Sequence, residues 1–246
     1  MKNKPLFLTA THGNEGFSKV FKTIEKIYPK NEYDYNWIIA NEKAYKENKR
    51  FIEKDLNRSA PGNISSIIYE EKRAAEIIQM AKDYDFVIDI HGTKSSFGIV
   101  AIVPYPNLQN ILLACMMSVD RIVIWHAKES REIGPLVQYI SCPAIELECG
   151  PKDTEETAAS LKRVIEDLLR KKDIFSIGPA LDLAQDKELY VVYGKLTTGE
   201  KQQELEDFRK ITTDNETFYP FMGKKEYKGI SCYKMKKVFL QDLFIY

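Results

Sequence analysis

Residues 5–16 read PLFLTA followed by THGNEG, and this stretch decides how the chain is organised. The apolar run at 5–10 predicts a short buried strand. His12 and Glu15 follow it three positions apart, with Gly13 and Gly16 beside them. Where a strand gives way to a helix, both side chains can face one metal ion, and a catalytic zinc site takes three protein ligands of this kind. The rest of the chain must then supply the third ligand.

His91 is the candidate for that ligand. It follows Phe86–Ile90, an apolar run typical of a central strand in a parallel sheet. Ligands of open α/β sheets gather at the carboxyl ends of strands, so His91 is expected to meet His12 and Glu15 at one crevice. The alternative is that His91 caps its strand by hydrogen bonding. His126 is interpreted as a surface or loop histidine.

The strand expected at 144–149 carries two acidic residues on one face. Alternation places Glu146 and Glu148 together, opposite Leu147 and Cys149. Carboxylates on a buried strand are costly unless they are paired, hydrogen-bonded or used. Glu148 is nearer the carboxyl end and is predicted to be the general base. Glu146 is predicted to support the site or to form a structural ion pair.

Residues 49–63 are polar and follow neither a helical nor a strand period, which predicts an ordered loop. This loop carries Arg50, Asn57 and Arg58. The planar guanidinium group of arginine binds carboxylates in a bidentate manner, so the loop is a candidate clamp for an acidic substrate. If these residues stood alone, ordinary solvated charges would be the default interpretation.

The remaining pattern predicts an α/β protein with two parts. Helices are expected at 15–28, from 65 or 66 to 83, at 108–118 and at 154–171, and strands at 35–40, 98–103 and 121–125. After about residue 177 the expected strands (189–196, 217–222 and 237–240) alternate with turns rich in glycine and lysine. We therefore predict a mixed, largely parallel sheet flanked by helices in residues 1–177, and a small β-rich domain in residues 178–246.

Composition narrows the functional classes. The 246 residues carry a formal net charge of zero, so no overall field favours nucleic acid or an anionic membrane. No apolar run approaches the roughly 20 residues that span a bilayer, and no signal-peptide pattern occurs. The four cysteines include no Cys-x-x-Cys pair, which favours reduced thiols and a cytoplasmic location. Homo-oligomerisation is left open.

Four motifs in this order resemble the aspartoacylase and succinylglutamate desuccinylase family, whose members are zinc deacylases related to the metallocarboxypeptidases. The motifs are His12-Gly-Asn-Glu-Gly, Arg50-Phe-Ile…Asp-Leu-Asn-Arg58, Asp-Ile-His91-Gly-Thr and Glu148-Cys-Gly-Pro. Each motif is weak alone, but the ordered set covers residues 5 to about 152. The resemblance implies a zinc-carboxypeptidase-like fold for the first part of the chain.

The resemblance also implies a role for each site residue. One zinc ion per chain would be held by His12, Glu15 and His91. Glu148 would be the catalytic carboxylate, and Arg50 would stabilise the oxyanion. The substrate α-carboxylate would be bound by Asn57 and Arg58, with Tyr227 as a further contact from the C-terminal domain. In aspartoacylases another arginine shortly before the glutamate reads a second carboxylate. Here Arg131 is the nearest candidate, and it precedes Glu148 by more than the family pattern, so specificity for aspartate or glutamate stays open.

The expected function is zinc-dependent hydrolysis of an N-acyl amino acid that bears a free carboxylate. Three alternatives remain. A carboxypeptidase-type hydrolase would use the same site on short peptides. A de-esterifying or deglycylating enzyme would act on a larger substrate, and a binding module would keep the fold without the chemistry.

Overall fold

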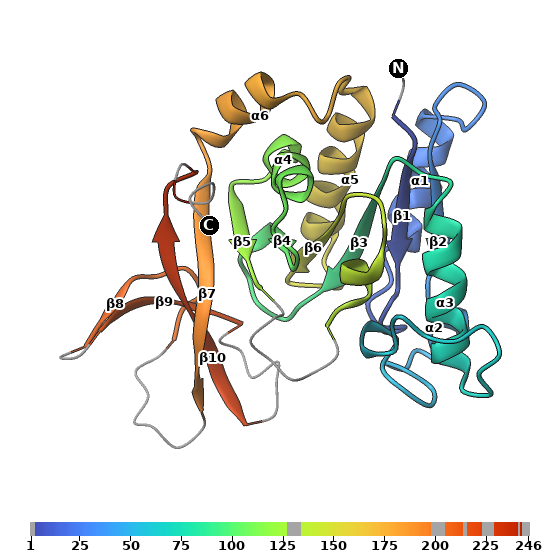
Figure 1. Cartoon of the computed structure of the whole chain (residues 1–246), viewed down its shortest axis with the longest axis horizontal. Helices are drawn as coiled ribbons and strands as arrows, with labels where there is room; N and C mark the ends of the chain where they lie inside the picture. The colour runs from blue at the N-terminus through green and yellow to red at the C-terminus, as the bar shows by residue number, and fades with distance from the viewer. Residues whose placement is uncertain are drawn as a thin grey trace.

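The computed structural model describes residues 3–126, 134–197, 205–213, 216–222, 229–240 and 242. One twisted sheet runs through these residues, with strand order β2-β1-β3-β6-β4-β5-β7-β10-β9-β8. Figure 1 shows it extending from the blue strands near the N-terminus to the orange and red strands near the C-terminus. The strands are β1 Pro5–Thr9, β2 Asn36–Ile39, β3 Phe86–Gly92, β4 Gly98–Val103, β5 Arg121–Ile124, β6 Ala144–Gly150, β7 Glu188–Thr197, β8 Ile211–Thr212, β9 Thr217–Phe221 and β10 Ile230–Val238.

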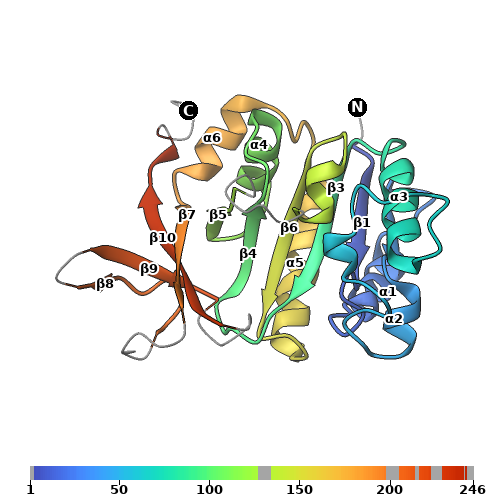
Figure 2. The ribbon, with the colours of Figure 1, turned by 60° about the horizontal axis from the view of Figure 1, so that its bottom comes forward.

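Strand direction changes once inside the α/β part. β2, β1, β3 and β6 are parallel, whereas β4 pairs antiparallel with β6. β5 and β7 then follow the direction of β4, and β10, β9 and β8 continue as antiparallel neighbours. The predicted fold class, a mixed and largely parallel sheet with flanking helices and C-terminal antiparallel strands, is confirmed. In Figure 2 the C-terminal strands lie at the end of the sheet opposite α1, α2 and α3.

Helices cover both faces of the sheet. The α-helices are α1 Ser18–Ile27, α2 Glu42–Lys46, α3 Tyr69–Ala81, α4 Leu108–Met116, α5 Glu155–Arg170 and α6 Ile177–Ala184, and two short 3-10 helices are η1 Leu56–Arg58 and η3 Leu136–Tyr139. α1, α4 and α5 pack on one face, and α3, η1 and η3 pack on the other. Among the described residues, no helix is long and apolar enough to cross a membrane.

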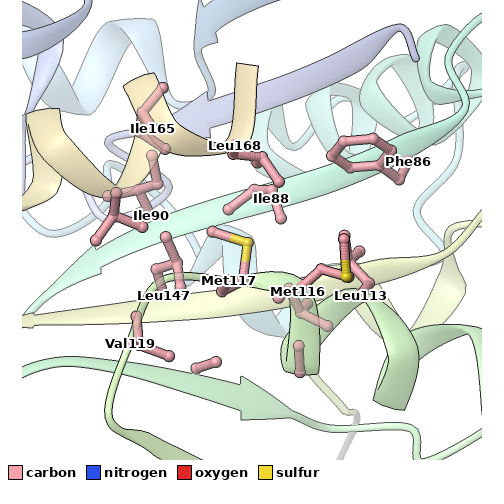
Figure 3. Close-up of a cluster of buried hydrophobic side chains, with 14 of the residues drawn as sticks. Phe86, Ile88, Ile90, Leu113, Met116, Met117, Val119, Leu147, Ile165 and Leu168 are labelled. Carbon is pink, nitrogen blue, oxygen red and sulfur yellow. The ribbon is translucent and has the colours of Figure 1, made fainter. Parts of the chain in front are cut away.

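The larger core lies under α4 and α5. Figure 3 shows Ile88 and Ile90 of β3 and Leu147 of β6 packed against Ile165 and Leu168 of α5, all almost or fully buried. Successive side chains of a strand point to opposite faces. Because these apolar residues occupy one face, the intervening polar residues of β3 and β6 are directed to the other.

That other face is divided into two apolar clusters. One cluster, under α3, η1 and η3, includes Leu8 and Leu136. The second cluster, beside the C-terminal strands, includes Val100 of β4, Phe221 of β9 and Met222. The polar residues of β3 and β6 lie on the strands between these clusters. The candidate site therefore occupies the middle of a sheet face.

Several predicted element boundaries were wrong. The helix expected from residue 15 begins at Ser18, because the preceding residues form a turn in which Phe17 N donates to Thr9 Oγ1 at 3.0 Å. The helix expected from 65 or 66 begins at Tyr69. The strand expected at 237–240 ends at Val238 and begins as early as Ile230, where pairing with β7 starts.

The C-terminal part of the chain continues the same sheet. Residues 177–184, where a change to short strands was expected, form α6. β7 then pairs with β5, for example Ile122 with Leu189. The division into domains 1–177 and 178–246 remains a prediction, and its boundary falls at the start of α6.

Candidate metal and substrate site

The turn after β1 holds His12 and Glu15 in place. Glu15 N donates to His12 O at 2.9 Å, which closes the turn, and Gly13 N donates to Arg50 O at 3.0 Å. A Cβ on Gly13 would lie 2.3 Å from the carbonyl carbon of Ala44 and 2.4 Å from Tyr45 N. Only glycine fits so close to another backbone segment. This turn (residues 11–16, hereafter the metal turn) is therefore fixed against α2 and against the loop of residues 49–63 (hereafter the arginine loop).

His12, Glu15 and His91 converge as the sequence predicts. Glu15 Oε2 lies 3.0 Å from His12 Nδ1 and 3.3 Å from His91 Nδ1. All three residues are buried, and their ligand atoms lie within 4.8 Å of one another. Gly92 N also donates to Glu15 Oε2 at 3.2 Å. Two imidazole nitrogens and one carboxylate oxygen thus face the same point.

The outer nitrogen of each imidazole faces a further carboxylate. His91 Nε2 lies 3.0 Å from Asp89 Oδ2, and His12 Nε2 lies 3.1 Å from Asp55 Oδ1. Thr11 Oγ1 donates to the second oxygen of Asp89 at 2.7 Å. A histidine that binds a metal usually donates its other N–H to such a partner, which fixes its tautomer and ring orientation.

Arg50 makes a competing contact with His12. Its Nη2 lies 2.8 Å from His12 Nε2, while its Nε and Nη2 also donate to Asp55 Oδ2 at 3.3 and 3.2 Å. A guanidinium group only donates and a carboxylate only accepts, so the two contacts of His12 Nε2 require different tautomers. A metal ion at Nδ1 requires the proton on Nε2, and this selects the hydrogen bond to Asp55.

The electrostatics of the pocket favour positive charge. Burial alone would raise the pKa of the Glu15 carboxyl group, but His12 and His91 hold that pKa well below its usual range. Burial would likewise lower the pKa of His91, yet the charge and hydrogen bond of Asp89 raise it well above its usual range. A divalent cation would supply positive charge at this point, between the candidate ligand atoms. The donor set and the two outer carboxylates together fit zinc.

Glu148 is placed beside the candidate metal ligands by strand register. β3 and β6 are parallel, and His91 pairs with Glu148 while Asp89 pairs with Glu146. Paired residues on neighbouring strands share a face, so Glu148 stands next to His91. Glu148 is half-buried, and Val100 of β4 is its neighbour on the other side. The site thus has a charged half toward β3 and an apolar half toward β4.

Glu146 lies deeper on the same face and is buried. Its Oε1 lies 3.5 Å from His91 Nε2 and accepts a hydrogen bond from Asn57 Nδ2 at 3.1 Å. Burial raises the pKa of Glu146, and the charge of His91 only partly offsets this effect. Asp89, His91 and Glu146 form a second group that could hold a metal ion. It uses the outer nitrogen of His91, which must carry a proton when the inner nitrogen binds a metal.

The arginine loop is ordered by a buried carboxylate on α3. Glu70 is completely buried and accepts hydrogen bonds from Ile52 N at 2.7 Å and from Glu53 N and Lys54 N at 3.2 Å each. Beyond this anchor, Asp55 Oδ1 caps η1 by accepting from Asn57 N at 2.9 Å. The loop is therefore held at both ends beside the metal turn.

The polar side chains of the arginine loop differ in their partners. The Arg50 side chain is 44% exposed, and its Nη1 lies 3.6 Å from Glu15 Oε1. Arg58 Nη1 donates to Asn57 O at 2.8 Å. Asn57 is buried, and its Oδ1 accepts from Leu136 N at 2.8 Å. Arg50 is thus accessible to a ligand, whereas both polar atoms of the Asn57 side chain have protein partners.

Two predicted substrate contacts, Arg131 and Tyr227, lie outside the described residues. His126 is half-buried after β5.

The structure adds Asp55, Asp89 and Glu70 to the residues around the candidate site, and the sequence analysis missed all three. Asp89 could have been found, because it precedes His91 by two positions on one strand and must share its face. No local pattern marks Asp55 or Glu70, whose roles depend on tertiary contacts.

A family model for the "Succinylglutamate desuccinylase/Aspartoacylase catalytic domain" matches residues 3–170, a segment that contains the metal turn, the arginine loop, β3 and β6. The chain belongs to this family. Its catalytic-domain match ends with α5 at Arg170, so α6 and the C-terminal strands lie beyond it.

Curated relatives match about half to three fifths of the chain. A "Probable aspartoacylase" of Prochlorococcus marinus subsp. pastoris is 30% identical over 162 residues, which cover 60% of this chain and 53% of that protein. A "Probable aspartoacylase" of Trichodesmium erythraeum is 30% identical over 129 residues, covering 47% of this chain and 44% of that protein. The chain spans about half the length of the curated relatives it matches.

Solved structures of other proteins share the fold over almost the whole chain. Murine aminoacylase 3 aligns with a TM-score of 0.73 at 17% identity and covers 96% of both chains. The succinylglutamate desuccinylase from Chromobacterium violaceum aligns with a TM-score of 0.70 at 14% identity, over 97% of this chain and 86% of that one. The C-terminal strands therefore belong to an architecture that is also found in these structures.

Proposed function

We propose that the chain is a zinc-dependent amide hydrolase that removes the acyl group from an N-acyl amino acid with a free carboxylate. The observation that carries this proposal is the convergence of His12, Glu15 and His91, with Glu148 on the adjacent strand beside His91. Membership of a deacylase family supports the same reaction class. Zinc supplies two things when bound: it lowers the pKa of a coordinated water and it polarises the scissile carbonyl.

In this proposal Glu148 is the general base and then the general acid. Its carboxylate accepts a proton from the attacking water and returns that proton to the leaving amine nitrogen. Glu148 suits this role because it lies beside the metal ligands but, unlike Glu146, is only half-buried. A carboxylate held next to the reacting atoms avoids the entropic cost of a separate encounter.

The arginine residues are proposed to hold the substrate. Arg50 is the accessible guanidinium group nearest the metal turn, so it stabilises the developing oxyanion. Arg58, the last residue of η1, binds the substrate carboxylate together with Asn57. Arg131 and Tyr227 remain proposed contacts from outside the described residues. A cytoplasmic location belongs to the same proposal.

A hydrolysis screen tests the function. Zinc-loaded protein is incubated with N-acetyl and N-succinyl amino acids and with short peptides, and release of the free amine is measured. Turnover of N-acyl amino acids is the expected result. Turnover of short peptides alone would replace the proposal with a carboxypeptidase-type activity. Binding without any turnover would favour a non-catalytic module.

The substitution Glu148→Gln tests the proton-transfer role. The amide cannot accept the water proton, so kcat should fall by about 100-fold or more, as expected for loss of a general base. Zinc content, measured by metal analysis, should stay at one ion per chain because Glu148 is not among the three proposed ligands. Retained turnover would remove Glu148 as the base, and loss of zinc would show that it acts through the metal.

A further inference from the structure

We infer that Lys152 is a positioning residue that ties the metal turn to the end of β6, and that this tie fixes the distance between the candidate metal ligands and the proposed base Glu148. The inference rests on the proposed function, because it concerns the geometry of that same site. It follows from the path of one lysine side chain across the end of the strand that separates the two parts of the site.

Strand order leaves the metal turn without a direct partner on β6. β1 leads into the metal turn, β6 carries Glu148, and β3 lies between these two strands. Pairing of β3 with β6 sets the register of His91 against Glu148 directly. The metal turn, in contrast, lies beyond the last residue of β1, Thr9, and one strand away from β6. A link from β6 to the turn would therefore restrict a distance that strand pairing alone leaves adjustable.

Lys152 forms this link with its backbone and its side chain. It is half-buried and follows the last residue of β6, Gly150, by two positions. Its backbone N donates to Thr93 O, just after β3, at 2.7 Å. Its Nζ donates to the backbone carbonyl of Asn14 at 3.2 Å. Residue 14 lies in the metal turn between the two candidate ligands, so one residue contacts all three segments.

Gly92, at the end of β3, gives the lysine its passage. A Cβ on Gly92 would lie 3.0 Å from Lys152 Cβ and 3.3 Å from Lys152 Cδ, so the lysine stem passes directly over this glycine. Only a residue without a side chain allows so close an approach. Gly92 N also donates to Glu15 Oε2 at 3.2 Å. The stem is thus held against the backbone unit that contacts a candidate ligand.

The consequence for the proposed reaction is a constraint on the base. A general base must lie within about 2.6–3.2 Å of the group whose proton it takes, and a displacement of about 1 Å can cost about 100-fold in rate. The metal turn and Glu148 reach the site from opposite sides of β3, and Lys152 spans the two. The arginine loop has a separate anchor in Glu70. Lys152 should therefore affect kcat more than KM.

The substitution Lys152→Met tests the tie, because it keeps an apolar stem over Gly92 and removes the donor to Asn14. It should weaken zinc binding by about 10-fold and lower kcat by about 10- to 100-fold, with KM nearly unchanged. Competition with a chromophoric chelator gives the zinc affinity without any substrate. Loss of a nearby positive charge alone would strengthen the binding of a cation, so weaker binding reports the lost tie.

Two variants serve as controls. Lys152→Arg keeps a charged donor and should recover most of the zinc affinity and of kcat. Lys172→Met removes the same charge from an exposed lysine beyond the other end of α5, and it should behave as wild type. Unchanged zinc affinity in Lys152→Met, or an equal loss in Lys172→Met, would overturn the inference.

Gly92→Ala keeps the test decisive if Lys152→Met does not fold. The added methyl group displaces the lysine stem, so zinc affinity should fall, and wild-type affinity in this variant would contradict the tie. Where both variants fold, their combined loss should be less than additive because they act through one contact; additive losses would also contradict it. Wild-type protein that binds zinc but hydrolyses no substrate would contradict the proposed function, while the chelator competition would still test Lys152.

Discussion

Asp89 illustrates how one buried residue shapes the candidate metal site. It is completely buried, and its two oxygens are used separately: Oδ2 faces His91 Nε2 and Oδ1 accepts from Thr11 Oγ1. A carboxylate buried without partners would be strongly destabilising, so its burial is tolerated because it is fully hydrogen-bonded. The result is an imidazole whose inner nitrogen is directed at Glu15.

The substitution Asp89→Ala should therefore weaken metal binding. Without its carboxylate partner the His91 ring loses its preferred tautomer and orientation, and loss of such a partner typically costs about 10- to 100-fold in metal affinity. Competition with a chromophoric chelator measures the zinc affinity directly. Asp167→Asn on α5 is a control, because this aspartate pairs with Lys171 and Ser118. Equal zinc affinity in Asp89→Ala and wild type would contradict the role.

At the scale of elements, α3 acts as a support for the arginine loop. Its first turn contributes Glu70, which accepts three consecutive backbone N–H groups from residues 52–54 and a hydrogen bond from Asn41 Nδ2 at 3.3 Å. One side chain thus replaces the backbone pairing that a loop lacks. The loop is ordered because a helix that packs under the sheet carries its hydrogen-bond acceptor.

Replacing Glu70 with alanine should loosen this loop. Three backbone N–H groups would lose their acceptor, at about 1–3 kcal/mol for each group that stays unsatisfied and is shielded from water. Hydrogen exchange at Ile52, Glu53 and Lys54 should accelerate well before global unfolding. Glu76→Ala on the same helix is the comparison, since Glu76 is 35% exposed and pairs only with Arg73 among the interactions described. Unchanged protection of residues 52–54 would show that the loop is held by other contacts.

The sequence predicts best the elements whose apolar residues follow a regular strand or helix pattern. The apolar runs of β3 and β6 and the amphipathic pattern of α5 give their positions to within a residue or two. The first turn expected for α1 is absent because Glu15 and its neighbours form the metal turn. Likewise, the ligand spacing in His12 and Glu15 is visible in the sequence. The contacts of Asp55, Glu70 and Asn57 are not visible, because they link residues from distant segments.

At the scale of the whole molecule, one sheet separates an apolar core from a polar site. All four cysteines, Cys115, Cys142, Cys149 and Cys232, are free thiols. Cys149 neighbours Glu148 in sequence but is directed into the core under α5. Core residues and the proposed catalytic residue therefore alternate along the same strand.

The four thiols are buried or half-buried, so we expect them to react slowly with thiol reagents in the folded protein. Burial raises the pKa of Cys115, Cys142 and Cys232 to about 11 and that of Cys149 well above its usual range. At pH 8 the folded protein holds these thiols protonated, and the thiolate is the reactive form. Labelling with a disulfide reagent should be slow at pH 8, accelerate as the pH rises toward 11, and become fast in denaturant. Cys142, which is only half-buried, should react first. Rapid native labelling of all four would contradict the predicted burial.

The pairing of β7 with β5 has a consequence for any shortened chain. Ile122 and Val123 of β5 are almost fully buried, and β7 supplies their hydrogen-bonding neighbour. A fragment that stops before β7 would expose an apolar edge strand with unpaired N–H and C=O groups, which invites pairing with another copy. Such a fragment should aggregate, as light scattering would show, even though it contains every proposed metal ligand. The C-terminal strands, beginning with β7, thus cover what would otherwise be an exposed edge, at β5, of the sheet that carries the site.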